Sequence, residues 1–149
     1  MGRSSREKDQ DPDTFIGIGF PLGYSDTGIF TQTKTTIEQA TYNLKNLLRT
    51  AKGERLGHPE FGCEVRDLLF EQITTDIEDR VEEKIKESVN TWIPYLSIDQ
   101  VVTEQINNRL NVVVKFSLKN DKTTVEKVTV QFELIESILA ADFVPDFPE

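Results

Sequence analysis

The spacing of apolar residues changes once along this chain, from the helical period of 3.6 to the strand period of two. Before position 95 the apolar residues recur every three or four positions, and after it they alternate with polar ones. Elements of one type that precede elements of the other are typical of an α+β fold. The sequence therefore predicts N-terminal helices, two longer and one short, followed by a three-stranded antiparallel meander.

The first longer helix is predicted over residues 37–51. Thr35 or Thr36 can act as its N-cap, and Gly53 is expected to stop it. A short helix from Val65 to Phe70 follows.

The second longer helix is predicted to begin at a capping box formed by Thr75 and Glu78, and Pro94 prevents its continuation. Charged residues surround a narrow apolar stripe on this helix, a pattern that favours a seam over a deep core. The stripe consists of Ile77, Val81, Ile85 and Val89.

The meander is predicted between Ile98 and Phe132, with turns at residues 107–108 and 120–121. Its two edges can accept another strand, although charges can also blunt an edge. The charges in question are Lys115, Lys119, Lys122 and Lys127.

The chain divides into a flexible arm at 1–13, a single α+β domain at 14–134 and a tail at 135–149. Residues 15–30 alternate short apolar pieces with glycine and proline, which predicts irregular extended structure or a loose hairpin. A length of 149 residues suits one self-supporting core.

Composition excludes several classes of function. A net charge of −9 disfavours nucleic acid as a partner, and no apolar run reaches the roughly 20 residues that a membrane span needs. The N-terminus lacks the apolar stretch of a secretory signal, so we expect synthesis in the cytoplasm. Cys63 is the only cysteine, which excludes an internal disulfide.

The segment GERLGHPEFG, from Gly53 to Gly62, is expected to hold one shape. Gly53 can end the preceding helix, Pro59 fixes its own φ, and Gly62 lets the chain reverse. Glu54 and Arg55 then project from a stiff connection. An Arg fork can bind a partner's carboxylate or carbonyls, or the two charges can form ion pairs within the chain.

Residues 47–71, LLRTAKGERLGHPEFGCEVRDLLFE, closely resemble the signature of the GPW-type baseplate wedge family. In that signature a helix with a leucine pair leads into GER, then P-x-FG, then LLF. The resemblance extends from about Phe15 to about Phe132. It implies a non-enzymatic subunit of a contractile-tail baseplate that initiates the tail sheath.

The resemblance also implies partners and sites. The expected location is the virion tail baseplate. The expected partners are other wedge proteins and sheath subunits, with the tail tube or hub as a further candidate. The wedge-binding loop would use Gly53, Glu54, Arg55, Pro59, Phe61 and Gly62. The sheath-docking sheet would use Val112, Val114, Phe116, Val128, Val130 and Phe132.

Two enzymatic interpretations compete with this one. A lysozyme-like tail component would pair Glu54 with Glu60 or Glu64, but a chain with 26 acidic residues contains such pairs by chance, and no aromatic-lined cleft is evident. His58 and Cys63 are too few ligands for zinc and lack an orienting third group for nucleophilic catalysis. We therefore expect neither a metal nor a cofactor. A generic soluble adaptor domain remains a non-enzymatic alternative.

Overall fold

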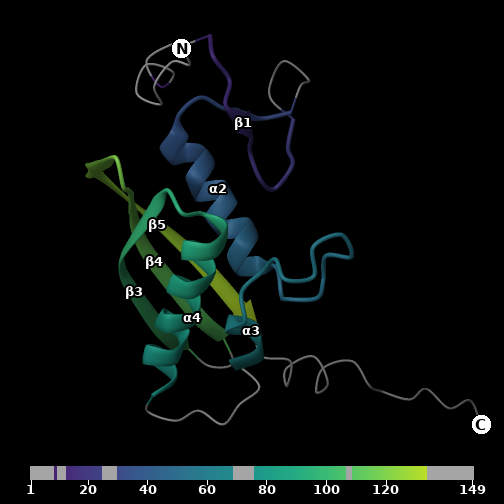
Figure 1. Cartoon of the computed structure of the whole chain (residues 1–149), viewed down its shortest axis with the longest axis vertical. Coiled ribbons are helices and arrows are strands. Elements are labelled where there is room, and N and C mark those ends of the chain that lie inside the picture. The colour runs from purple at the N-terminus through teal and green to yellow at the C-terminus, as the bar shows by residue number, and fades with distance from the viewer. Residues whose placement is uncertain (1–8, 10–12, 25–29, 69–75, 107–108, 134–149) are drawn as a thin grey trace, which may run out of the picture.

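Two helices cover one face of a three-stranded antiparallel sheet in the computed structural model (Figure 1). The structure describes residue 9 and residues 13–24, 30–68, 76–106 and 109–133. The helices are α2 (Thr36–Arg49), α3 (Val65–Leu68) and α4 (Ile77–Trp92). The sheet consists of β3 (Leu96–Ile106), β4 (Arg109–Leu118) and β5 (Asp121–Glu133), in that order. The predicted α+β class and meander are confirmed.

Helix α2 begins as predicted, because the Glu38 N–H donates to the side chain of the N-cap Thr35 at 3.3 Å. It ends two residues earlier than predicted. Thr50 leaves the helical conformation, and its hydroxyl donates to the Asn46 carbonyl at 2.7 Å. Gly53 therefore lies in the following loop and does not stop the helix directly.

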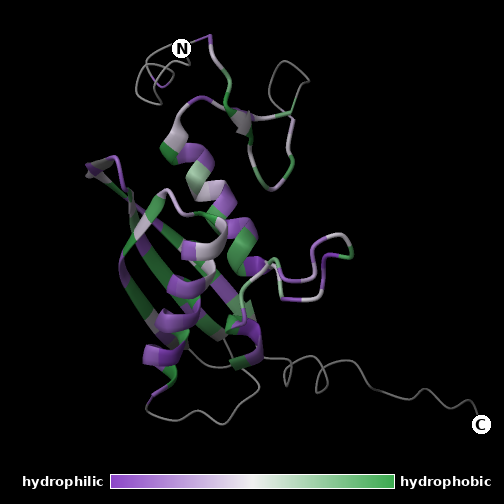
Figure 2. Ribbon diagram, in the orientation of Figure 1, coloured by the Kyte–Doolittle hydropathy of each residue, from purple (hydrophilic) through white to green (hydrophobic). Residues whose placement is uncertain are grey.

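Helix α4 contradicts the prediction of a seam. Val81, Ile85 and Val89 are at most 1% exposed and belong to the core of the domain. The stripe is narrow because α2, α3 and β3 cover only that side, while the outer side is hydrophilic (Figure 2). The cap residue is Asp76, which makes no side-chain cap hydrogen bond, and Thr75 lies outside the described residues.

The sheet alternates as the period-two pattern predicts. Val112 pairs with Val130 and Val114 with Val128, and all four side chains face the helices. Strand β3 starts at Leu96, two residues before the predicted start, and a bulge interrupts its pairing with β4 between Ile98 and Gln100. The opposite face is mostly polar, and no helix of the described part covers it (Figure 1).

A small antiparallel ribbon precedes α2, in agreement with the predicted loose hairpin. It pairs β1 (Gly17–Ile18) with β2 (Gln32–Thr33), and a further bridge joins Tyr24 to Phe30. The ribbon lies beside the N-terminal half of α2 (Figure 1).

Several predictions fall outside the described residues: most of the arm at 1–13, the end of the short helix at 69–70, the turn at 107–108 and the tail at 135–149. None of the helices in the described part is both long and apolar enough to span a bilayer.

Candidate partner-binding loop

The loop from Gly53 to Gly62 joins α2 to α3 and is closed by backbone hydrogen bonds. The Gly53 N–H donates to the Pro59 carbonyl at 2.7 Å, and the His58 N–H donates to the Arg55 carbonyl at 3.1 Å. The Phe61 N–H donates to the His58 carbonyl, also at 3.1 Å. These bonds hold the ten residues in one shape, as their glycine and proline content predicts.

Gly53 and Gly62, the first and last residues of the loop, are constrained to be glycine in different ways. Both have positive φ, 90° at Gly53 and 134° at Gly62, which disfavours any residue with a Cβ. Around Gly53 a Cβ would meet nothing within 4 Å, whereas at Gly62 it would lie 2.5 Å from the Thr50 carbonyl oxygen. Gly62 is therefore needed for both conformation and space.

Glu54 makes its contacts within the chain. One carboxylate oxygen accepts from the Ala51 N–H at 3.0 Å, and the other lies 3.1 Å from the Arg66 guanidinium. Both side chains of the ion pair are about half exposed, so it adds little stability. The interpretation of Glu54 as an internal loop support fits these contacts.

Arg55 stacks on an aromatic side chain. Its guanidinium lies 4.3 Å from the centre of the Phe61 ring. The Phe61 and Trp92 rings in turn pack edge to face, with their centres 5.2 Å apart. The His58 ring lies edge to face with the same indole, with the two ring centres 6.4 Å apart. This contact holds the guanidinium against the ring, and no carboxylate partner is found for it among the described residues.

Leu56 follows Arg55 and is fully exposed, at 101%. A single exposed leucine is ordinary on a protein surface, so Leu56 matters here only through its position beside Arg55. The loop therefore presents a stacked cation and a bare apolar side chain next to each other.

Glu64 secures the end of the loop. Its two carboxylate oxygens each lie 2.7 Å from a lysine ammonium, one of Lys52 and one of Lys84. Hydrogen bonds from Lys52 and Lys84 lower the pKa of Glu64 from 4.5 to about 2. The carboxylate thus joins the end of α2, the start of α3 and the middle of α4.

Cys63 is buried behind the loop at 1% exposure. Burial raises the pKa of its thiol, which makes it a poor nucleophile. The described residues contain no group of three or more side chains able to hold a metal ion. His58 lies against Trp92, which accounts for its position without catalysis.

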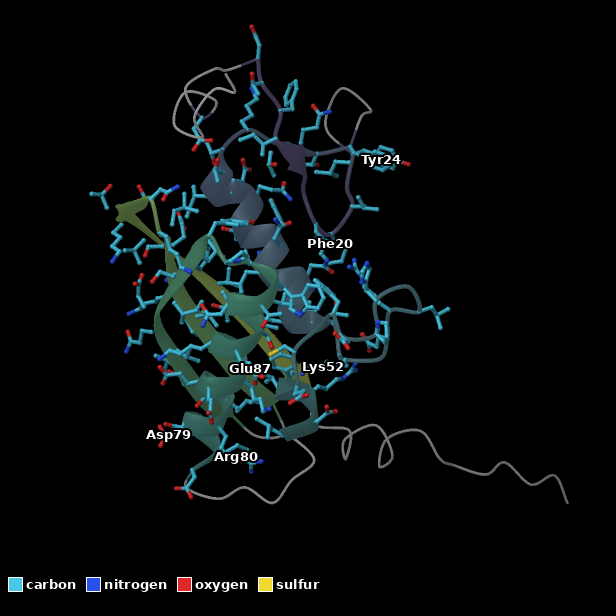
Figure 3. All side chains as sticks on the ribbon, in the orientation of Figure 1. Phe20, Tyr24, Lys52, Asp79, Arg80 and Glu87 are labelled. Carbon is cyan, nitrogen blue, oxygen red and sulfur yellow. The ribbon has the colours of Figure 1, made fainter. Side chains whose placement is uncertain are left out.

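A hollow of about 440 Å³ lies beside the loop, and one aromatic side chain, that of Trp92, belongs to its lining. Glu60 also lines it, as do Lys52 and Glu87, which are labelled in Figure 3. Glu54 does not line it, and the lowered pKa of Glu64 is the opposite of what a general acid needs.

The six sheet residues expected to meet the sheath do not form a surface. Val112, Val114, Phe116, Val128, Val130 and Phe132 are all at most 9% exposed and pack in the core. Their period-two spacing identified the buried face of the sheet, which α2 and α4 cover. Any contact of the sheet with a partner must use its open face or its edges.

Sequence reasoning missed Trp92 as the centre of the aromatic cluster and Lys84 as a partner of Glu64. Trp92 lies 31 positions after Phe61, and only the packing of α4 against the loop brings them together. The sole tryptophan of the chain was the available signal.

Comparison with known proteins gives a family match across the loop, both longer helices and most of the sheet. Residues 34–123 match the family model of the baseplate wedge protein gp25. A protein of that name from Enterobacteria phage T4 is 32% identical over 93 residues, which make up 60% of this chain and 69% of the phage protein. The matched range is shorter at both ends than the expected range of about 15–132.

Two solved structures share the fold. A protein of Geobacter sulfurreducens, provisionally described as a tail lysozyme, has a TM-score of 0.61 and 25% identity, covering 68% of this chain and 94% of that one. A chain of the anti-feeding prophage baseplate has a TM-score of 0.54 and 20% identity, covering 78% and 82%. At that identity the second likeness concerns the fold alone.

Proposed function

Because this chain belongs to the family of the baseplate wedge protein gp25, we propose that it binds other wedge proteins through the Gly53–Gly62 loop and initiates sheath assembly through its sheet. The family makes it a structural component of a tail baseplate. Wedge proteins and sheath subunits are its proposed partners, and the tail tube or hub is a further candidate.

The tip of the loop carries the proposal of wedge binding. Glu54 is already paired within the chain, whereas Arg55 and Leu56 are presented to the outside. A partner with a carboxylate beside an apolar hollow would satisfy both side chains at once. Because the loop is held by its own hydrogen bonds, little conformational entropy would be lost on binding.

Replacement of Arg55 by Ala tests this assignment. The variant should keep the circular dichroism spectrum and urea midpoint of the parent, because the Arg55 side chain is exposed and its guanidinium lies over the Phe61 ring rather than in the core. Its incorporation into purified baseplates should fall, whereas Arg49→Ala, at the exposed end of α2, should incorporate normally. Normal baseplates with the Arg55 variant would rule out the loop as a wedge contact.

The open face of the sheet supports the proposal of sheath initiation. Lys115 on β4 lies directly opposite Lys127 on β5, and both are exposed on this face. Like charges placed opposite each other are unfavourable in the isolated sheet. A partner that brings a carboxylate between them would relieve this repulsion, and the β5 edge beside them can accept another strand.

A lysozyme-like activity is the second candidate, favoured by the Trp92-lined hollow and by the description of the Geobacter protein. Purified chain would be incubated with peptidoglycan, and the release of reducing sugar would be measured. The structural function predicts no release. Activity that is lost in Glu60→Gln but kept in Glu54→Gln would establish the enzyme, because Glu60 lines the hollow and Glu54 does not.

A further inference from the structure

The N-terminal ribbon, residues 13–24 and 30–34, exposes an unusual amount of apolar surface. Seven of the ten large apolar residues that are exposed in the described part lie between Phe15 and Phe30. The four aromatic side chains among them expose the equivalent of about two whole rings, or roughly 300 to 500 Å². This area, summed over the four side chains, is comparable in size to the largest contiguous apolar patch of a typical soluble monomer, and patches of that size often bind partners.

The alternation of the first strand is inverted relative to an ordinary surface strand. Gly17 and Gly19 face α2, and a Cβ on Gly17 would collide with the side chain of Gln39. The alternate positions Ile16, Ile18 and Phe20 face away from α2 and are 36%, 50% and 40% exposed. A strand that covers its own core places apolar residues inward and polar residues outward. Here the glycines face inward and the apolar residues outward.

The ribbon is also fixed in place, so its outer face is presented in one orientation. The Thr33 hydroxyl, fully buried, donates to the Gln39 side chain at 2.6 Å. The Gln39 amide donates to Asn43 at 2.9 Å, and the Asn43 amide donates to the Tyr95 hydroxyl at 3.1 Å. This polar chain runs along α2 and connects the ribbon to the beginning of β3.

Charge distinguishes between possible occupants of the outer face. The two charged residues of the ribbon, Asp13 and Lys34, are the first and last of its residues, and the Lys34 ammonium lies 5.6 Å from the centre of the Phe15 ring. Residues 14–24 and 30–33 contain no Asp, Glu, Lys, Arg or His, so the face around Ile18 fits a partner surface without charges. A second copy would bring a net charge of −9 toward another of −9, which opposes self-association. In Figure 3 the Tyr24 side chain, 77% exposed, points away from the rest of the described chain.

We infer that the outer face of the ribbon, centred on Ile18, binds an uncharged apolar surface of a different protein chain in the assembled tail. All of the ribbon except Lys34 precedes the matched region 34–123, and the ribbon is a different segment of the chain from the Gly53–Gly62 loop. The inference needs the chain to be part of a tail, but it does not need the loop or the open sheet face to be binding sites.

Thiol labelling tests the inference on the full-length chain. Ile18→Cys places a thiol on the outer face, and Asp79→Cys places one on the exposed first turn of α4 as the control. The native Cys63, 1% exposed, serves as the unreactive reference. Maleimide labelling would be followed by mass spectrometry in the free chain and in assembled tails.

In the free chain, Cys at 18 should react as fast as Cys at 79, and in tails at least ten times more slowly than when free. Equal rates in tails and in the free chain would overturn the inference. Slow reaction already in the free chain would also overturn it, because another part of the same chain would then cover the face.

Sedimentation of the free chain tests whether a second copy of this chain occupies the outer face. A monomer is expected; a dimer that Ile18→Asp dissociates would identify a second copy as the occupant and refute the different partner. Normal baseplates with Arg55→Ala would refute the loop proposal while leaving the labelling result at position 18 valid, so the two failures are distinguishable.

Discussion

Gly62 crosses the end of α2 in direct contact with Thr50. A Cβ on Gly62 would lie 2.5 Å from the Thr50 carbonyl oxygen, and the same oxygen accepts a hydrogen bond from the Cys63 N–H at 2.9 Å. The loop therefore returns to the helix it left, and this close contact positions its tip.

Gly62→Ala is expected to destabilise the domain more than Gly53→Ala does. Both substitutions place a Cβ at positive φ, which costs about 1 kcal/mol, but only the first also forces the chain away from Thr50. We expect Gly62→Ala to lower the free energy of unfolding by about 2 kcal/mol or more, measured by urea denaturation. Equal losses in the two variants would contradict the crowding at Gly62.

Glu64 should make the stability of the domain depend on pH in the acid range. Its folded-state pKa of about 2 lies below its ordinary value of 4.5, so its contribution is complete above pH 4.5 and is lost as the pH falls toward 2. Glu64→Gln should therefore be less stable than the parent at pH 7 and approach it at pH 2 to 3. Glu60→Gln, at an exposed position of the Gly53–Gly62 loop, removes one carboxylate in the same way and serves as the matched control; its stability should differ little from that of the parent.

Local patterns in the sequence predict the elements of this fold well. The apolar stripe of α2, the position of Pro94 after α4 and the alternation in β4 each act over a few residues and are visible in a single chain. The stiffness of the loop also follows from Gly53, Pro59 and Gly62.

Contacts across the fold were not predictable in the same way. The stack of Arg55 on Phe61 depends on Trp92, which is close only because α4 packs behind the loop. The seam predicted for α4 was wrong for the same reason, since a narrow stripe does not show how many neighbours cover it. Likewise, the alternation identified which side chains of the sheet face the core. It did not show that no helix of the described part covers the opposite face.

Phe116→Ala tests the assignment of the inward sheet residues to the core. Phe116 is fully buried between the sheet and the helices, so its truncation should lower the free energy of unfolding by about 3 to 5 kcal/mol. Val125→Ala, 54% exposed on β5, should change it by less than about 0.5 kcal/mol. A small effect at Phe116 would mean that this face is not the core.

Leu56→Asp separates binding from folding at the tip of the loop. Because Leu56 is fully exposed, the substitution should change the free energy of unfolding by less than about 0.5 kcal/mol. A charge is unfavourable in the apolar hollow that we propose on the partner, so incorporation into baseplates should drop more with Leu56→Asp than with Leu56→Ala. Competition between tagged variant and parent during assembly measures the difference, and equal incorporation of Leu56→Asp and parent would place the tip outside the interface.

Lys127→Glu is expected to affect the isolated chain and sheath assembly in opposite directions. It places a carboxylate opposite Lys115, which should raise the free energy of unfolding by up to about 1 kcal/mol. In the tail the same carboxylate would repel the acidic group that we propose for the sheath, so electron microscopy should show more baseplates without sheath. Lys122→Glu makes the same charge change at another exposed position of β5 and serves as the control. If Lys127→Glu tails carried sheath as often as the control, contact through the open face near Lys127 would be refuted, and the sheet edges would be the remaining route to the sheath.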